Sequence, residues 1–352
     1  MCQTIRSRAP LRIGFAGGGT DLKEYSDING GHVVNATISK YAFTEINISK
    51  KTGHHFFSAI SLDSEKAVSF SSFEQLQNDS MCGKVAKELI LPTQVHQFMC
   101  LSYPQIKSYK VSAKTYSDVP IGSGLGSSST IVVALVKAYD ECFSIGLDKI
   151  QIAETAYKIE RELCGYAGGY QDQFSATFGG FNSISFSRHS NVVAPLDIKS
   201  WFRWELESSL ILHSTSTTRD SSLIIKDQII SAKANTEEKS GSLHRIKSIS
   251  WEMKKAILNS NFDRMCSCLN EAWHAKIASS SKITNNYIST LIDNSKEYGA
   301  RAAKISGAGG GGFILFMANP SDAAILKKFL SSTGRPTFFC SFVKDGCQSW
   351  KA

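Results

Sequence analysis

The sequence predicts an α+β fold with two domains, and three observations support this. The 352 residues exceed what one simple core usually holds. The first half alternates short β-like runs with glycine-rich loops. The end of the chain has a β–α–β pattern, typical of a ferredoxin-like sandwich, over residues 303–317, 322–332 and 337–343. The pattern changes near residue 200, so we expect one domain over residues 1–200 and a second over residues 201–352.

The individual elements follow from hydrophobic periodicity. Strands are expected at residues 8–15, 41–48 and 110–116, with hairpins and a short helix in the polar stretch over residues 50–100. Helices are expected at residues 129–143 and 148–163, and the second begins at an acidic cap, Asp148. A loop over residues 164–173 leads to a turn and a strand over residues 174–186. A strand at residues 210–214 and a mostly helical stretch over residues 220–298 follow.

The composition is ordinary for a soluble globular protein, with 42% apolar and 20% charged residues. No apolar run reaches the roughly 18 residues of a membrane span, and the N-terminus has no leader pattern, so we expect a cytoplasmic protein. Nine cysteines without a C-x-x-C pair favour free thiols over a zinc cage or disulfides. The net charge of +8 is spread along the chain, and we expect no nucleic-acid or membrane partner.

Residues 120–129 form the most informative segment, P-I-G-S-G-L-G-S-S-S, between a strand and an apolar helix. Its glycines let successive N–H groups face one ligand, and the helix N-terminus adds partial positive charge. We call it the phosphate loop, because this combination suits a nucleotide phosphate better than the alternative of a flexible turn. The chain has no Walker loop, and Ser127 replaces the third glycine of a dinucleotide fingerprint. The expected ATP-binding residues are Gly122, Gly124, Leu125, Gly126, Ser127, Ser128 and Ser129.

Two more glycine-rich segments lie towards the two ends of the chain. The first glycine segment, residues 9–21, ends in Asp21, whose carboxylate can accept sugar hydroxyl bonds. It also resembles a dinucleotide site, but Ala16 interrupts the glycine pattern and no ribose-binding acid follows. The third glycine segment, residues 304–312, has five glycines in the six residues from Gly307 to Gly312. A loop that closes over phosphates or substrate explains them better than a tight turn does.

Two carboxylates complete the set of candidate residues. Glu160 lies late in the expected helix, where a surface position paired with Arg161 is the alternative. Asp172 follows two glycines, where a structural turn aspartate is the alternative. Phosphoryl transfer needs a Mg²⁺ ligand and a group that orients or deprotonates the attacking hydroxyl. Together, these two side chains are able to supply both.

Taken in order, the three glycine-rich segments resemble those of the GHMP kinase superfamily, which includes galactokinase, homoserine kinase, mevalonate kinase and phosphomevalonate kinase. The resemblance covers nearly the whole chain. It implies an N-terminal domain like ribosomal protein S5 domain 2, a ferredoxin-like C-terminal domain and a site between them. The segments R-A-P-L-R-I-G-F-A-G-G-G-T-D-L, K-I-E-R-E-L, G-G-Y-Q-D-Q-F-S-A-T-F-G-G-F-N and K-I-S-G-A-G-G-G-G-F are most similar to those of D-glycero-α-D-manno-heptose 7-phosphate kinases.

The resemblance also implies roles for single residues. Ser128 and Glu160 match Mg²⁺ ligands, Asp172 matches the catalytic aspartate beside the reacting hydroxyl, and Arg12 matches the basic residue that pairs with it. Gly18 and Gly19 stand where galactokinase has an acid and a histidine, which argues against galactose. The implied substrate-binding residues are Gly17, Gly18, Gly19, Thr20, Asp21, Gly169, Arg219, Lys304 and Gly307.

The implied activity is ATP-dependent and Mg²⁺-dependent phosphorylation of the anomeric hydroxyl of a heptose 7-phosphate, giving the 1,7-bisphosphate. A distal phosphate needs basic partners, for which Arg219, Lys276 and Lys304 are candidates, each with a surface cation as the alternative. Three alternative hypotheses for the function stay open. One is a kinase of another sugar such as L-fucose, the second is a non-catalytic sensor of sugar and ATP, and the third is a dinucleotide oxidoreductase.

Overall fold

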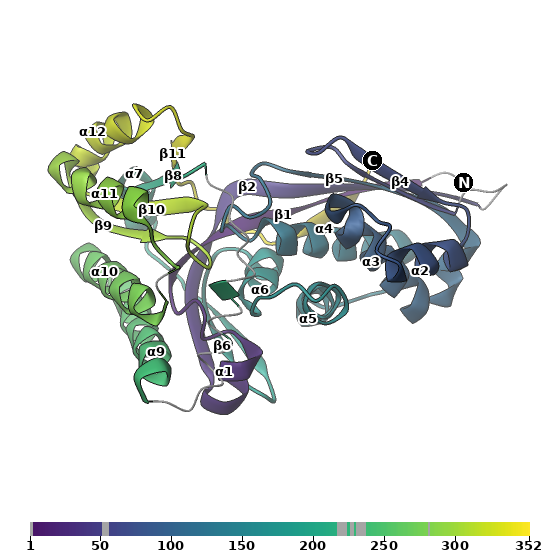
Figure 1. The fold of residues 1–352 in the computed structure, drawn as a ribbon, viewed down its shortest axis with the longest axis horizontal. Coiled ribbons are helices and arrows are strands. Elements are labelled where there is room, and N and C mark those ends of the chain that lie inside the picture. The colour runs from purple at the N-terminus through teal and green to yellow at the C-terminus, as the bar shows by residue number, and fades with distance from the viewer. Residues whose placement is uncertain (1–2, 51–55, 217–223, 226–228, 230–236, 281) are drawn as a thin grey trace.

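The computed structural model describes residues 3–50, 56–216, 224–225, 229, 237–280 and 282–352, and it confirms the α+β class. Figure 1 shows a large sheet with helices on one face and a smaller sheet with its own helices beside it. The long strand β2, Gly31–Lys50, extends along the large sheet towards the smaller one. Within the described part of the chain, every helix falls short of the length or apolarity that crossing a membrane requires.

The large sheet has eight strands, in the order β12-β1-β2-β5-β3-β4, with β6 beside β2 and β7 beside β6. The predicted strands in the first half are confirmed, and β1 and β2 are longer than expected. The last strand returns from the C-terminus and pairs with the start of β1, from Ile5 with Lys351 to Arg8 with Gln348. The strands are β1 (Gln3–Ala16), β2 (Gly31–Lys50), β3 (Phe57–Ser61), β4 (Lys66–Phe70), β5 (Tyr109–Ser117), β6 (Phe181–Phe186), β7 (Asn191–Pro195) and β12 (Gln348–Lys351).

Helix α4 is the central helix of the first half, and most of its side chains are buried against the large sheet and the neighbouring helices. Its N-terminus, at Ser127, therefore has a fixed position. The helical elements here are α1 (Lys23–Asn29), α2 (Phe73–Met81), η1 (Lys87–Leu89), α3 (Ile90–Ser102), η2 (Pro104–Ser108), α4 (Ser127–Phe143), α5 (Lys149–Tyr157), η3 (Lys158–Leu163) and α6 (Gln171–Phe178).

The expected loop and turn before β6 are wrong in one respect, because α6 occupies residues 171–178. Phe174 is fully buried in a cluster with Ile184 and Phe186, and this packing outweighs the weak helix propensity of the aromatic and hydroxyl side chains. Asp172 consequently lies in the first turn of a helix instead of in a turn.

The smaller sheet has four antiparallel strands in the order β11-β8-β10-β9. Along the chain, β8, a helical crossover, β9, β10, α12 and β11 give the predicted ferredoxin-like β–α–β–β–α–β arrangement. The expected strand over 303–317 is two strands with the third glycine segment between them. The elements are α7 (Ser200–Ser209), β8 (Leu210–Ser214), α9 (Glu237–Leu258), α10 (Phe262–Ser279), α11 (Asn286–Ser295), η4 (Lys296–Tyr298), β9 (Ala300–Ile305), β10 (Phe313–Ala318), α12 (Pro320–Ser331) and β11 (Thr337–Phe339).

One apolar core connects the two sheets. It joins Leu11 and Phe15 of β1 with Met253 of α9, Leu269 of α10 and Leu315 of β10. Helices α9 and α10 thereby cover the end of β1 that carries the first glycine segment (Figure 1). The domain boundary near residue 200 stays a prediction.

Candidate active site

A cavity of about 700 Å³ lies where the phosphate loop, the first glycine segment, the start of α6 and the third glycine segment meet. Gly17, Thr20, Leu125, Ser129 and Glu160 are buried and do not belong to its lining, and Arg219 lies outside the described residues. The remaining predicted site residues line the cavity: Arg12, Gly18, Gly19, Asp21, Gly122, Gly124, Gly126, Ser127, Ser128, Gly169, Asp172, Lys304 and Gly307.

The phosphate loop curls into the N-terminus of α4 through glycines that no other residue could replace without strain. Gly124 and Gly126 have φ angles of 78° and 82°, in the left-handed region. A Cβ atom on Gly124 would lie 2.3 Å from the carbonyl oxygen of Ser306, so the phosphate loop and the third glycine segment touch backbone to backbone. Ser128 lines the cavity in the first turn of α4, where the helix end favours an anion.

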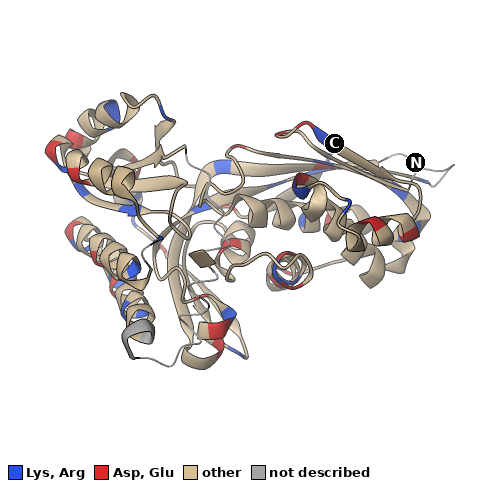
Figure 2. Cartoon of the chain, viewed as in Figure 1, with Lys and Arg blue, Asp and Glu red and all other residues tan. Residues whose placement is uncertain are grey.

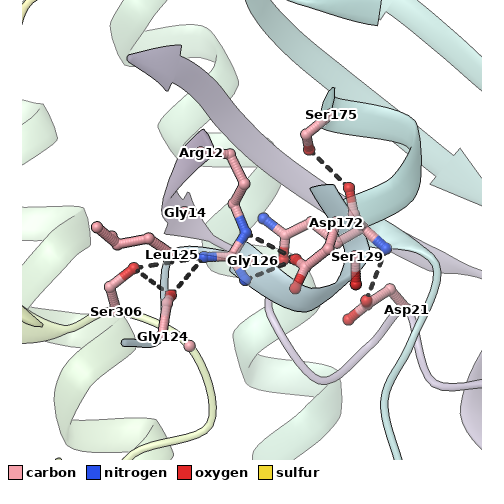
Figure 3. Close-up of polar contacts among 12 residues, drawn as sticks. Arg12, Gly14, Asp21, Gly124, Leu125, Gly126, Ser129, Asp172, Ser175 and Ser306 are labelled. Carbon is pink, nitrogen blue, oxygen red and sulfur yellow. Dashed lines mark hydrogen bonds and ion pairs between the residues drawn. The ribbon is translucent and has the colours of Figure 1, made fainter. Parts of the chain in front are cut away.

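Arg12 connects three of the segments (Figure 3). Its Nε donates to Asp172 Oδ1 at 2.7 Å, and its Nη1 donates to the Gly124 carbonyl at 2.6 Å. Ser306 Oγ donates to the same carbonyl at 2.9 Å. A register shift between β1 and β2 occurs between Pro10 and Arg12, and such irregularities often re-aim side chains at active sites. The guanidinium therefore holds Asp172 beside the phosphate loop.

Asp21 is held in place by backbone N–H donors. It accepts hydrogen bonds from the backbone N–H of Gly19 at 2.9 Å and of Gln171 at 3.0 Å. Burial raises the pKa of Asp21, and the nearby Asp172 carboxylate adds to the rise. Thr20 is fully buried and donates to the carbonyl oxygens of Gly17 and His32, which shapes the loop from behind.

Glu160 lies in a π-helical turn, η3, of the kind often found at functional sites. Its side chain is fully buried and accepts a hydrogen bond from Gln173 Nε2 at 2.7 Å. Its Oε1 lies 3.3 Å from Arg161 Nη1 and has no hydrogen-bond partner among the described residues. Gln173 and Arg161 both also donate to Ser129 Oγ. The carboxylate is thus linked to the first turn of α4.

This arrangement fits a Mg²⁺ ion in donor chemistry. Mg²⁺ prefers oxygen ligands and is usually bound through one or two carboxylates together with substrate phosphates. Glu160 has a carboxylate oxygen to which no described residue donates a hydrogen bond, and the Ser128 hydroxyl belongs to the cavity wall at the helix N-terminus. Arg161 neutralises Glu160 in this structure and lines the cavity next to it.

Two lysines from the second half line the same cavity. Lys276, on α10, is buried and donates to the Gly307 carbonyl. Burial, with a contribution from Arg12, lowers the pKa of Lys276 to about 8. Lys304 donates to the carbonyls of Gly14 at 2.9 Å and Phe15 at 3.2 Å, and burial lowers its pKa well below the usual range. An anion bound here would stabilise the charged form of both lysines.

Comparison with known proteins identifies the family. Two family models match the chain, GHMP kinases N terminal domain over residues 91–180 and GHMP kinases C terminal over residues 253–335. A D-glycero-α-D-manno-heptose 7-phosphate kinase from Campylobacter jejuni is 36% identical over 350 residues, which cover 99% of both chains. This chain belongs to the GHMP kinase family. It is therefore an ATP-dependent kinase.

A crystal structure and a second sequence relative are also similar to this chain. The crystal structure of a D-glycero-D-manno-heptose 1-phosphate kinase from Bacteroides thetaiotaomicron matches with a TM-score of 0.79, 32% identity and 99% coverage of both chains. An L-fucokinase/L-fucose-1-P guanylyltransferase from Bacteroides fragilis is 26% identical over 97% of this chain and 37% of its own length. The likeness to the crystal structure confirms the two-part GHMP kinase fold.

Several residues of this GHMP kinase's cavity were not predicted from the sequence as site residues: Lys87, Arg161, Tyr166, Gln171 and Ser306. Gln171 had a usable signal, since it directly precedes Asp172 in the sequence. Lys87 had none, because it lies in the polar stretch before α3. Figure 2 shows Lys and Arg interspersed with Asp and Glu over the described elements, so charge in the sequence did not single out the cavity cations.

Proposed function

We propose that this GHMP kinase transfers the γ-phosphate of ATP to the anomeric hydroxyl of D-glycero-α-D-manno-heptose 7-phosphate, giving the 1,7-bisphosphate. The observation that carries the proposal is the pair of buried lysine side chains, Lys276 and Lys304, in a cavity whose phosphate loop already provides for the nucleotide. A second anion site suits an acceptor that itself carries a phosphate. The heptose 7-phosphate kinase from Campylobacter jejuni, at 36% identity, supports the same substrate.

In this proposal, the ATP phosphates lie along the phosphate loop. Ser128 and Glu160 would hold Mg²⁺, which neutralises charge on the transferring phosphate when it is bound. Backbone N–H groups at the start of α4 stabilise the same charge. These groups are fixed before substrate binds, because α4 is packed into the core.

On the acceptor side, Asp172 orients the anomeric hydroxyl or accepts its proton. An anomeric hydroxyl is more acidic than an ordinary alcohol, so positioning supplies most of what the step requires. Arg12 holds the carboxylate through Nε at 2.7 Å. Asp21 accepts hydrogen bonds from sugar hydroxyls, and Lys276 and Lys304 bind the distal phosphate.

Two alternatives follow from the relatives. An unphosphorylated sugar such as L-fucose, named in the Bacteroides fragilis relative, would leave the two lysines without a counter-ion. The Bacteroides thetaiotaomicron relative is named a heptose 1-phosphate kinase, so the position of the transferred phosphate also needs a test. The cytoplasmic location remains part of this proposal. The cysteines among the described residues are free thiols, which is compatible with such a reducing compartment.

The test is ADP release from Mg-ATP with a panel of acceptors. The panel contains D-glycero-D-manno-heptose 7-phosphate, the 1-phosphate, mannose, galactose and L-fucose. We expect the 7-phosphate to give the highest kcat/KM and the Asp172→Asn variant to lower kcat about 100-fold to 10,000-fold. Preference for an unphosphorylated sugar would keep the kinase and overturn the heptose phosphate assignment. ATP binding without turnover of any acceptor would overturn both.

A further inference from the structure

Gln171 lines the cavity with a backbone held by hydrogen bonds, and its side chain has no role assigned so far. It is the first residue of α6 and directly precedes Asp172. Its N–H donates to Asp21 Oδ2 at 3.0 Å, and its carbonyl accepts from Ser175 Oγ at 2.6 Å. The residue is only 6% exposed, yet it lines the cavity. These two hydrogen bonds fix the position from which the Gln171 side chain extends along the cavity wall.

The side-chain amide of Gln171 has unmet hydrogen-bonding capacity. Nε2 is enclosed and has no partner among the described residues. Oε1 is not enclosed in this way, so it is the amide atom that remains open to the cavity. A buried amide left unpaired costs free energy, and such a group in a native structure calls for an explanation.

Two glycines of the first segment lie against this amide. A Cβ atom on Gly14 would lie 3.1 Å from Gln171 Nε2, and a Cβ atom on Gly18 would lie 3.6 Å from Oε1. Both glycines line the cavity. The amide therefore lies across the glycine segment, with its nitrogen over β1 and its oxygen towards Gly18.

Asn35 carries a second unpaired amide near the nitrogen end. It stands opposite Gly14 in the β1–β2 ladder, and opposed residues of a ladder project from the same face of the sheet. Asn35 is fully buried, and both of its amide atoms also lack partners among the described residues. No hydrogen bond joins the two amides among the described residues, so Nε2 of Gln171 is unpaired and Oε1 is left for a ligand.

We propose that Gln171 determines sugar specificity: its Oε1 accepts a hydrogen bond from a hydroxyl of the acceptor sugar, next to the hydroxyl that Asp172 orients. The proposal rests on the proposed function only in that the ligand is a sugar. It does not depend on whether that sugar carries a phosphate. A sugar deoxygenated at the contacted carbon would lose the interaction.

The test replaces Gln171 by methionine, which keeps the length of the side chain and removes the amide. We expect Gln171→Met to raise the KM of the acceptor sugar about tenfold, the effect of one hydrogen bond. The KM of ATP should change less than about twofold. The thermal unfolding midpoint should stay level or rise, because the lost Nε2 had no partner among the described residues.

Gln173→Met is the matched control on the same helix. The Nε2 of Gln173 already holds Glu160 and Ser129, so this variant should lower the unfolding midpoint. The acceptor is whichever sugar the wild-type protein phosphorylates best, so failure of heptose 7-phosphate would not prevent the test. An unchanged sugar KM in Gln171→Met, or a loss of stability like that of Gln173→Met, would overturn the proposal.

Discussion

Replacement of Lys276 by methionine tests the second anion site most sharply. Lys276 is 5% exposed, lines the cavity and donates to the Gly307 carbonyl, with two N–H donors left for a ligand. Methionine fills nearly the same volume without charge. If Lys276 binds the distal phosphate, the variant loses a charge-assisted hydrogen bond to that phosphate and keeps the shape of the cavity.

The expected rise in KM follows from the loss of that hydrogen bond. Hydrogen bonds to charged groups contribute about 1.5–3 kcal/mol, so the KM of heptose 7-phosphate should rise roughly 10-fold to 150-fold. The KM of ATP should change little. Stability should not fall, since Lys276→Met removes a cation whose burial already disfavours its charged form.

The pH dependence gives an independent check. The pKa of Lys276 is lowered to about 8 by burial, so the ammonium group is charged below that pH and lost above it. We expect kcat/KM for the sugar phosphate to fall as the pH rises through about 8 in the wild type and not in Lys276→Met. Because the folded pKa lies below the ordinary value of 10.5, the free energy of unfolding should rise with pH between these two values.

The assay is steady-state ADP release at varied pH, with thermal unfolding beside it. Lys255→Met is the control, because Lys255 lies on the neighbouring helix α9 and its side chain is 68% exposed. It should behave as the wild type does. A role for Lys276 in binding the sugar phosphate is refuted if Lys276→Met raises the KM of ATP instead, or leaves the KM of the sugar phosphate unchanged.

Three further predictions concern the centre of the cavity. Asp172→Asn keeps the shape of the side chain and should lower kcat about 100-fold to 10,000-fold with little change in ATP binding by calorimetry; near wild-type kcat would exclude a catalytic role. Arg12→Met removes the hydrogen-bond partner of Asp172 and one of the two donors to the Gly124 carbonyl, and it should cost about 3 kcal/mol of stability in urea unfolding; an unchanged free energy of unfolding would show that the pair is unimportant. Glu160→Gln should raise the Mg²⁺ concentration needed for half-maximal activity, and an unchanged requirement would place the metal elsewhere.

Local chemistry made the phosphate loop predictable from the sequence. The glycines before α4 have the left-handed backbone that their residue type favours, and the helix begins two residues before the expected position. The pairing of Arg12 with Asp172 is long-range; the family resemblance alone implied it, and the structure has it at 2.7 Å. Local features such as the glycine loop are predictable from the sequence, because residues that are close together in the chain determine them.

Long-range placement was not predictable in the same way. Lys276 lies more than 250 residues after Arg12, and only the packing of α10 across β1 brings it to the cavity. The helix at Gln171 was assigned to a loop, since burial of Phe174 decides it and propensity does not. Strand β12 pairs with the opposite end of the chain, and no local pattern signals such a partner.

The identity of the product tests the proposed phosphoryl transfer most directly. Phosphorus NMR of a reaction with Mg-ATP and D-glycero-D-manno-heptose 7-phosphate would follow the sugar as ATP is consumed. We predict a second phosphate resonance, coupled to the anomeric proton, that grows in step with ADP. A new phosphate resonance coupled to a proton other than the anomeric one, or ADP formation with only free phosphate as product, would contradict transfer to the anomeric hydroxyl.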